Sequence, residues 1–194
     1  MELGIDKQQA DELVKKYITE PITKMHLLES AAIMQALAER FGENEEEWGI
    51  IGLLHDIDWD LTKNNSARHC VQAQEILRQA GASDFLVETV VSHGYGMEAI
   101  PAFEDKQRTT NVQYCLIAAE TLTGLIIAST LMQPDKKLAS LSLQSLKKKF
   151  KSKSFAARCN RESIKECEKA EIPLDEFLAI GLKALQGISV KLGL

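Results

Sequence analysis

The sequence predicts an all-α fold for the whole chain of 194 residues. Apolar residues recur at helical spacing from the start, as at Ala10, Leu13, Val14 and Tyr17. The alternation of apolar and polar residues that marks β-strands is almost absent. With 45% hydrophobic and 26% charged residues, the composition is ordinary for a globular protein that buries one substantial core.

The first helix is expected over 6–18, and Pro21 closes it. Thr23 is expected to cap a second helix, over 24–41, which stops at Gly42. Apolar residues lie on most sides of this second helix, so it should be largely buried.

A third helix is expected to begin in the acidic run 43–47, because negative charge favours a helix N-terminus, and to end at His55-Asp56. Residues 57–65 are expected to form a loop. Further helices are expected from Ser66 to Ala80, from Phe85 to about His93 with Ser83 as its cap, and at about 110–132, 160–170 and 174–185. The stretch 94–108 is expected to be irregular.

Composition limits the cellular context. The net charge of −5 argues against generic nucleic-acid binding, and four cysteines without a CxxC pair indicate reduced thiols. The first residues lack the apolar core of a signal peptide. The apolar stretch 112–132 contains Gln113 and Glu120, which favours a buried core helix over a membrane span. We therefore expect a cytoplasmic protein that does not bind membranes.

The doublet His55-Asp56 is a candidate metal site. Neighbouring side chains on a regular helix point about 100° apart, so they do not share a face. At a helix end both can turn toward one point, and imidazole nitrogen with carboxylate oxygen suits Zn, Mn, Fe or Mg.

The other three histidines, His26, His69 and His93, also fall at or near predicted helix ends. A lone histidine in such a place is usually a capping or core residue. Four histidines with this placement favour a set of metal ligands.

Glu120 is the only charged residue between Thr109 and Pro134. A buried carboxylate without a partner is destabilising by several kcal/mol, so it requires a cation or a hydrogen-bond donor. Two alternatives follow: an ion pair with an arginine such as Arg68 or Arg40, or a place among the metal ligands.

The order of His26, the HD doublet and Glu120 inside the segment AAETLTG resembles the HD-domain superfamily of metal-dependent phosphohydrolases, over roughly residues 23–130. It resembles in particular a group of small hydrolases with HDID and AAETLTG-like segments. The resemblance implies that His26, His55, Asp56 and Glu120 hold one divalent ion. It also implies a single HD-type domain over 1–194, with a metal-binding core at about 23–130 and a helical extension at about 135–194.

His69 and His93 match the additional histidines of two-metal members such as the HD-GYP phosphodiesterases. In that case Asp56 would bridge two ions and act as the catalytic residue that positions the activated water. The sequence departs from the family at two points: Glu120 stands where Asp is usual, and Asp58-Trp59 replaces the Gly-Lys of HDIGK. Lys63 or a residue of the basic segment would have to take the place of that lysine at the substrate phosphate.

The basic segment, residues 136–161, contains nine Lys or Arg and no Asp or Glu. It forms either a solvated helix face with a loop or a phosphate-facing flank of the site. Lys153 and Arg161 are the substrate-side candidates. An RNA-binding surface is the weaker alternative, since only Phe150 and Phe155 could stack on bases.

The sequence contains no GxSxG, P-loop or GxGxxG motif. The leading hypothesis is a phosphohydrolase that uses one or two divalent ions (Mn, Fe, Zn or Mg) on a small phosphate ester, with nucleotides among the candidates. The alternative is a non-catalytic, nucleotide-sensing HD module. A third alternative, oxygenase chemistry at a di-iron HD site, is selected by nothing in the sequence.

Overall fold

The computed structural model describes residues 2–194, and over that range the chain is helical with no β-strand, which confirms the predicted all-α class. The α-helices are α1 (Lys7–Tyr17), α2 (Pro21–Phe41), α3 (Glu45–Leu54), α4 (Trp59–Thr62), α5 (Val71–Gln79), α6 (Asp84–Val91), α7 (Asn111–Leu131), α8 (Leu143–Lys151), α9 (Arg161–Lys165), α10 (Leu174–Gly187) and α11 (Ser189–Leu192). Single 3₁₀ turns are η1 (Ser66–Arg68), η2 (Ser92–Gly94), η3 (Pro101–Phe103), η4 (Leu138–Ser140) and η5 (Glu166–Ala170).

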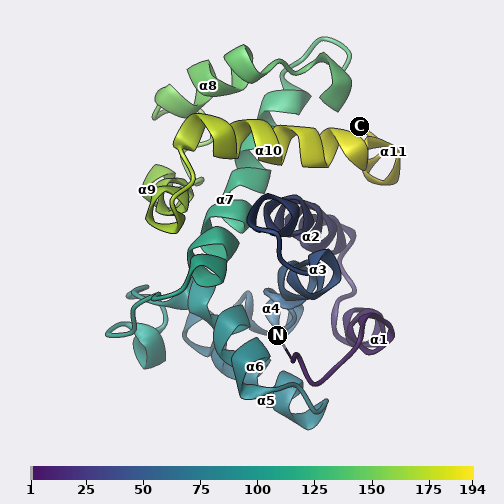
Figure 1. Ribbon diagram of the computed structural model, residues 1–194, viewed down its shortest axis with the longest axis vertical. Helices are drawn as coiled ribbons and strands as arrows, with labels where there is room; N and C mark the ends of the chain where they lie inside the picture. Colours follow the sequence, from purple (N-terminus) through teal and green to yellow (C-terminus); the bar gives the residue numbers. More distant parts are fainter. Residues whose placement is uncertain (1) are drawn as a thin grey trace.

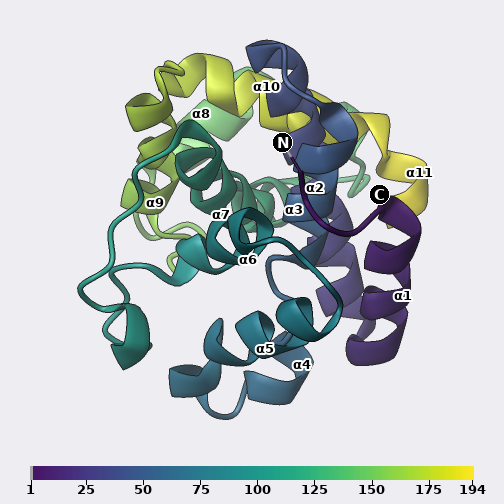
Figure 2. The same ribbon diagram turned by 60° about the horizontal axis from the view of Figure 1, so that its bottom comes forward.

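Helix α7 is the central element, and it runs along the long axis of the molecule (Figure 1). Helices α5 and α6 lie toward one end of it, and α8 and α10 toward the other (Figures 1 and 2). Most of its side chains are buried, and Glu120 is its only charged residue. A Cβ on Gly181 of α10 would lie 2.5 Å from Leu122 of α7, so this glycine permits the close crossing of the two helices.

Helices α2 and α3 lie side by side against α7 (Figure 1). Their close approach depends on Gly52, because a Cβ there would lie 2.8 Å from the backbone of Ala31. His55 follows Gly52 by three residues, and this contact therefore brings the end of α3 beside the first turns of α2.

The beginning of α2 differs from the prediction. The helix starts at Pro21, a residue suited to the first helical position, and Thr23 does not cap it. The carboxylate of Asp60 in α4 accepts the N–H groups of Thr19 and Glu20 at 2.6 and 2.9 Å, and the Thr23 hydroxyl donates to the same carboxylate at 2.9 Å. A residue about forty positions away in sequence thus performs the capping.

Three further segments differ from the sequence prediction. The expected loop 57–65 contains the short helix α4, and the expected helix 66–80 is broken at His69-Cys70 into η1 and α5. Cys70 has φ 64° and ψ −33°, a conformation that ends one helical turn and starts another in a new direction. The helix expected to reach His93 ends at Val91, and His93 lies in η2. The predicted cap Ser83 is confirmed. The structure adds Asn44 and Thr110 as the N-caps of α3 and α7.

Among the described residues, α7 is the one helix that is long and apolar enough to cross a membrane by length and composition alone. In its most apolar window 61% of the residues are buried inside the protein, as in a core helix.

Glu29 of α2 provides a pH-dependent test of the fold. Its side chain is buried, and burial raises its pKa from 4.5 to about 7. Because the pKa of Glu29 is higher in the folded state, its protonated form contributes fully to the free energy of unfolding below about pH 4.5. This contribution is lost as the pH rises through about 7. We expect wild type to lose on the order of 2–3 kcal/mol relative to Glu29→Gln over this range, measured by urea unfolding. Glu39→Gln, at an exposed position of the same helix, should show no such pH-dependent difference.

Candidate metal centre

Four histidines and one aspartate from different elements converge in one buried region. His26 comes from α2, His55 and Asp56 follow α3, His69 ends η1, and His93 lies in η2. Three of the four imidazoles are buried, while the His26 side chain is 27% exposed and so faces an opening.

The histidines form two pairs. The Nε2 atoms of His26 and His55 lie 3.1 Å apart, and the Nε2 atoms of His69 and His93 lie 3.0 Å apart. Asp56 lies between the pairs: its Oδ1 is 3.4 and 3.3 Å from Nε2 of His69 and His93. Its Oδ2 is 3.6 and 3.8 Å from Nε2 of His55 and His26. Each oxygen of one carboxylate therefore faces one pair of imidazoles.

The outer nitrogen of each imidazole already has a partner. Nδ1 of His55 lies 2.9 Å from the Gly52 carbonyl, and Nδ1 of His93 lies 2.7 Å from the Val90 carbonyl. Nδ1 of His69 lies 2.9 Å from the Asp58 carboxylate. Since these oxygens only accept hydrogen bonds, each Nδ1 must donate its proton.

His26 follows the same rule through Thr123. The Thr123 hydroxyl donates to the Glu120 carbonyl at 2.7 Å, so it accepts from Nδ1 of His26 at 3.0 Å. In the neutral form all four imidazoles therefore direct an Nε2 lone pair at the Asp56 carboxylate. Metal-binding histidines commonly have this arrangement, in which an outer-shell acceptor fixes the tautomer.

The converging lone pairs require a positive charge between them. The ion-pair partners of Asp56 over residues 2–194 are histidines, and no lysine or arginine is among them. Metal–nitrogen and metal–oxygen bonds of about 2.0–2.2 Å place donor atoms about 3.3–3.6 Å apart at the tetrahedral angle. The separations of 3.0–3.8 Å around the two Asp56 oxygens bracket that value, so the residues fit a divalent ion on each side.

The pKa values describe the same need for positive charge. Burial lowers the pKa of His69, but its hydrogen bond to Asp58 gives a net rise to about 10. Burial lowers the pKa of His55 to about 3. Burial alone would raise the pKa of Asp56, yet the surrounding imidazoles hold it well below its usual value. Asp56 is therefore ionised, and the buried pocket favours a cation beside it.

Glu120 lies at the edge of this cluster. Its Oε2 is 3.9 Å from Nε2 of His26, and its Oε1 accepts a hydrogen bond from the Thr121 hydroxyl at 2.5 Å. Burial raises its pKa. Neither proposed arginine pairs with it, since Arg40 contacts Glu176 and Arg68 contacts Gln72. That Glu120 is a metal ligand stays a prediction.

A cavity of about 320 Å³ opens beside His26 and Glu120. Residues of α7 line it, and so does the segment 158–163, including Arg158 and Asn160. Arg158 is thus a basic residue of this segment that lines the cavity beside His26 and Glu120.

The three substrate-side candidates have other surroundings. Lys63 pairs with Glu20 at 3.1 Å on the surface. Lys153 lines an adjoining cavity, which shares Arg158 and Asn160 with the first. Arg161 is a correction to the prediction, because its N–H groups donate to main-chain carbonyls, those of Lys149, Phe150, Ser152, Phe155, Ala156 and Cys159. With all of its donors engaged, Arg161 ties the end of α8 to the following loop and is not free for a substrate.

Sequence reasoning missed four residues of the site. Asp58 is fully buried, and its Oδ1 orients His69 while its Oδ2 accepts the N–H of Ala73 at 3.1 Å. Thr123 orients His26, Arg158 lines the cavity, and Cys70 lies 3.6 Å from Nε2 of His93. The alternation of Asp56 and Asp58 in the sequence could have indicated a role for Asp58. The roles of Thr123, Arg158 and Cys70 depend on tertiary contacts.

Comparison with known families agrees with this geometry. The HD domain family profile matches residues 23–123, just over half of the chain, and this range contains all four histidines, Asp56 and Glu120. No curated protein and no solved structure gives a significant match. The chain belongs to the HD domain family.

Proposed function

We propose that the protein is a metal-dependent phosphohydrolase that cleaves a small phosphate ester, with nucleotides among the candidate substrates. The observation that carries this proposal is the division of the Asp56 carboxylate between two histidine pairs. A single carboxylate with one oxygen toward each set of nitrogen donors is suited to two neighbouring divalent ions. Membership of the HD domain family supports the same class of reaction.

The protein's own residues would prepare the site for hydrolysis. When bound, divalent ions supply Lewis acidity to a phosphate oxygen and lower the pKa of water. Asp56 stays ionised and offsets part of their charge, while the imidazoles hold their Nε2 lone pairs inward. The buried walls reduce competition from bulk water, which strengthens electrostatic interactions inside. This chemistry requires no serine or cysteine nucleophile.

Arg158 is the proposed anchor for the substrate phosphate. It lines the same cavity as His26 and Glu120, and its guanidinium can donate two parallel hydrogen bonds to phosphate oxygens. The volume of about 320 Å³ suits a small molecule, and the adjoining cavity lined by Lys153 extends the basic surface.

One observation favours the alternative of a nucleotide-binding module without turnover. Lys63, the nearest candidate for the lysine of HDIGK, is paired with Glu20. A panel of phosphomonoesters and phosphodiesters with Mn, Fe, Mg and Zn separates the two functions. Turnover that disappears in Asp56→Asn supports the hydrolase, whereas ligand-induced melting shifts without turnover would support the sensor.

Metal content tests the two-sided site. We expect wild-type protein to hold up to two ions per chain, and His69→Ala and His93→Ala each to fall toward one, because each removes a ligand from the same side. His55→Ala combined with Asp56→Ala should lose both ions, since Asp56 faces both pairs. Metal analysis of protein purified without chelator measures this. Asp105→Asn, at an exposed carboxylate outside the cluster, is the control. Equal metal in the double variant and wild type would contradict the site.

Thr123 tests the orientation of His26. Thr123→Val removes the hydroxyl that accepts from Nδ1 of His26, so the ring loses its fixed tautomer. We expect metal affinity to fall about 10–100-fold, measured by competition with a chelating dye. Thr130→Val is the matched control, because Thr130 is equally buried in α7 and its hydroxyl bonds only the Ile126 carbonyl. Equal affinities in both variants would argue against the role of Thr123.

Arg158 tests the substrate side. Removal of one charge-assisted contact to phosphate is expected to raise KM at least about tenfold in Arg158→Ala, with kcat changed far less. Arg158→Lys should recover part of the loss. Lys148→Ala removes an exposed charge of the same basic segment on α8 and should leave KM unchanged. An equal effect at Lys148 would indicate diffuse charge attraction instead of a specific contact.

A further inference from the structure

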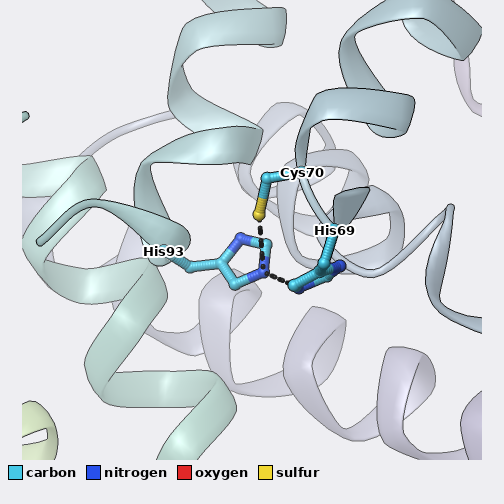
Figure 3. Close-up of side chains that lie close together, drawn as sticks. All are labelled: His69, Cys70 and His93. Carbon is cyan, nitrogen blue, oxygen red and sulfur yellow. Dashed lines mark hydrogen bonds between the residues drawn. The ribbon is translucent and has the colours of Figure 1, made fainter. Parts of the chain in front are cut away.

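Cys70 is held in an unusual position beside the second histidine pair. It lies between His69 and the first residue of α5, is fully buried, and has φ 64° and ψ −33°. Residues other than glycine rarely adopt this conformation, and it persists only where surrounding contacts enforce it. Figure 3 shows the Cys70 sulfur directed at the His93 ring, with His69 on the other side of the same nitrogen.

Gly94, the residue after His93, leaves space for this sulfur. Sγ of Cys70 lies 3.6 Å from Nε2 of His93, and a Cβ added at Gly94 would lie 2.7 Å from the same sulfur. A side chain at position 94 would therefore displace the sulfur. The ligand atoms of His69, Cys70 and His93 all lie within 4.8 Å of one another.

Asp56 lies beside the two nitrogen donors of this group. Its Oδ1 is 3.4 and 3.3 Å from Nε2 of His69 and His93. Metal–sulfur bonds of about 2.3 Å and metal–nitrogen bonds of about 2.0 Å place sulfur and nitrogen about 3.5 Å apart at the tetrahedral angle. The distance of 3.6 Å from Sγ of Cys70 to Nε2 of His93 agrees with a sulfur and a nitrogen bound to the same ion.

We propose that the Cys70 thiolate is a ligand of the ion held by His69 and His93. On binding, the thiol releases its proton to solvent and the sulfur donates an electron pair to the ion. Thiolate is a soft ligand, so this side selects Zn²⁺, Fe²⁺ or Co²⁺ over Mg²⁺. This role of Cys70 rests on the proposed function, because both use the His69–His93 pair. It determines which metal binds and not which reaction is catalysed.

The two sides of Asp56 then differ in the ligand atoms that they offer to a metal ion. The side of His26 and His55 offers nitrogen and carboxylate oxygen, and its nearest further group is Glu120. Cys159, the cysteine nearest to that side, lines the cavity and does not belong to the donor group. One thiophilic site and one nitrogen–oxygen site therefore share a single carboxylate.

Cobalt substitution tests this assignment without reference to activity. Full-length protein freed of metal with a chelator is titrated with Co²⁺ and followed by absorption. We expect a near-ultraviolet thiolate-to-cobalt charge-transfer band in wild type that a large excess of Mg²⁺ does not remove.

The variants separate Cys70 from the other thiols. Cys70→Ser and Cys70→Gly should lose the band and bind Zn²⁺ at this side more than about tenfold less tightly, with the other side still occupied. Glycine accepts positive φ, so Cys70→Gly keeps the test valid where the serine variant fails to fold. Cys167→Ser, at another buried cysteine far from the cluster in sequence, should keep the band.

The outcomes of the cobalt titration and of the substrate panel test the Cys70 ligand and the phosphohydrolase activity separately. A band that is absent from cobalt-loaded wild type, or that persists in Cys70→Gly, would overturn the Cys70 assignment while leaving phosphohydrolase activity to be judged by the substrate panel. A band without turnover of any phosphate ester would support Cys70 and count against the proposed function. Protein that binds no metal would overturn both.

Discussion

The structure depends on four imidazoles whose Nε2 atoms converge on one buried carboxylate. Such convergence is unfavourable without a cation, because like partial charges lie about 3 Å apart in a medium that screens them poorly. The apolar helices around the site supply the packing that offsets this. The outer nitrogens of the imidazoles are fixed by hydrogen bonds to main-chain carbonyls, Asp58 and Thr123.

The scaffold assembles the site from segments that are far apart in sequence. His26 and Thr123 are separated by 97 positions, and the contact between them joins α2 to α7. Gly52 brings α3 against α2 and also supplies the carbonyl that orients His55. Gly52 therefore permits close helix packing and also fixes, through its carbonyl, which nitrogen of His55 carries the proton.

Much of this could be predicted from the sequence, since helical periodicity and capping residues are local signals. The helical class and the placement of His26, His55, His69 and His93 near helix ends required no tertiary information. The break at Cys70 was not predictable, because residues 66–80 carry a continuous helical pattern and a cysteine gives no local signal for a positive φ. Arg158 and Arg161 could not be distinguished either. Both are basic residues in one segment, and only the fold decides which guanidinium meets carbonyl groups and which meets a cavity.

Helix α4 has a consequence beyond its four residues. Its N-cap, Asp58, fixes the ring of His69, and Asp60 within it anchors the start of α2, which carries His26. The helix is therefore a mechanical link between the two sides of Asp56. Any displacement of α4 would therefore act on His69 through Asp58 and on the start of α2, which carries His26, through Asp60.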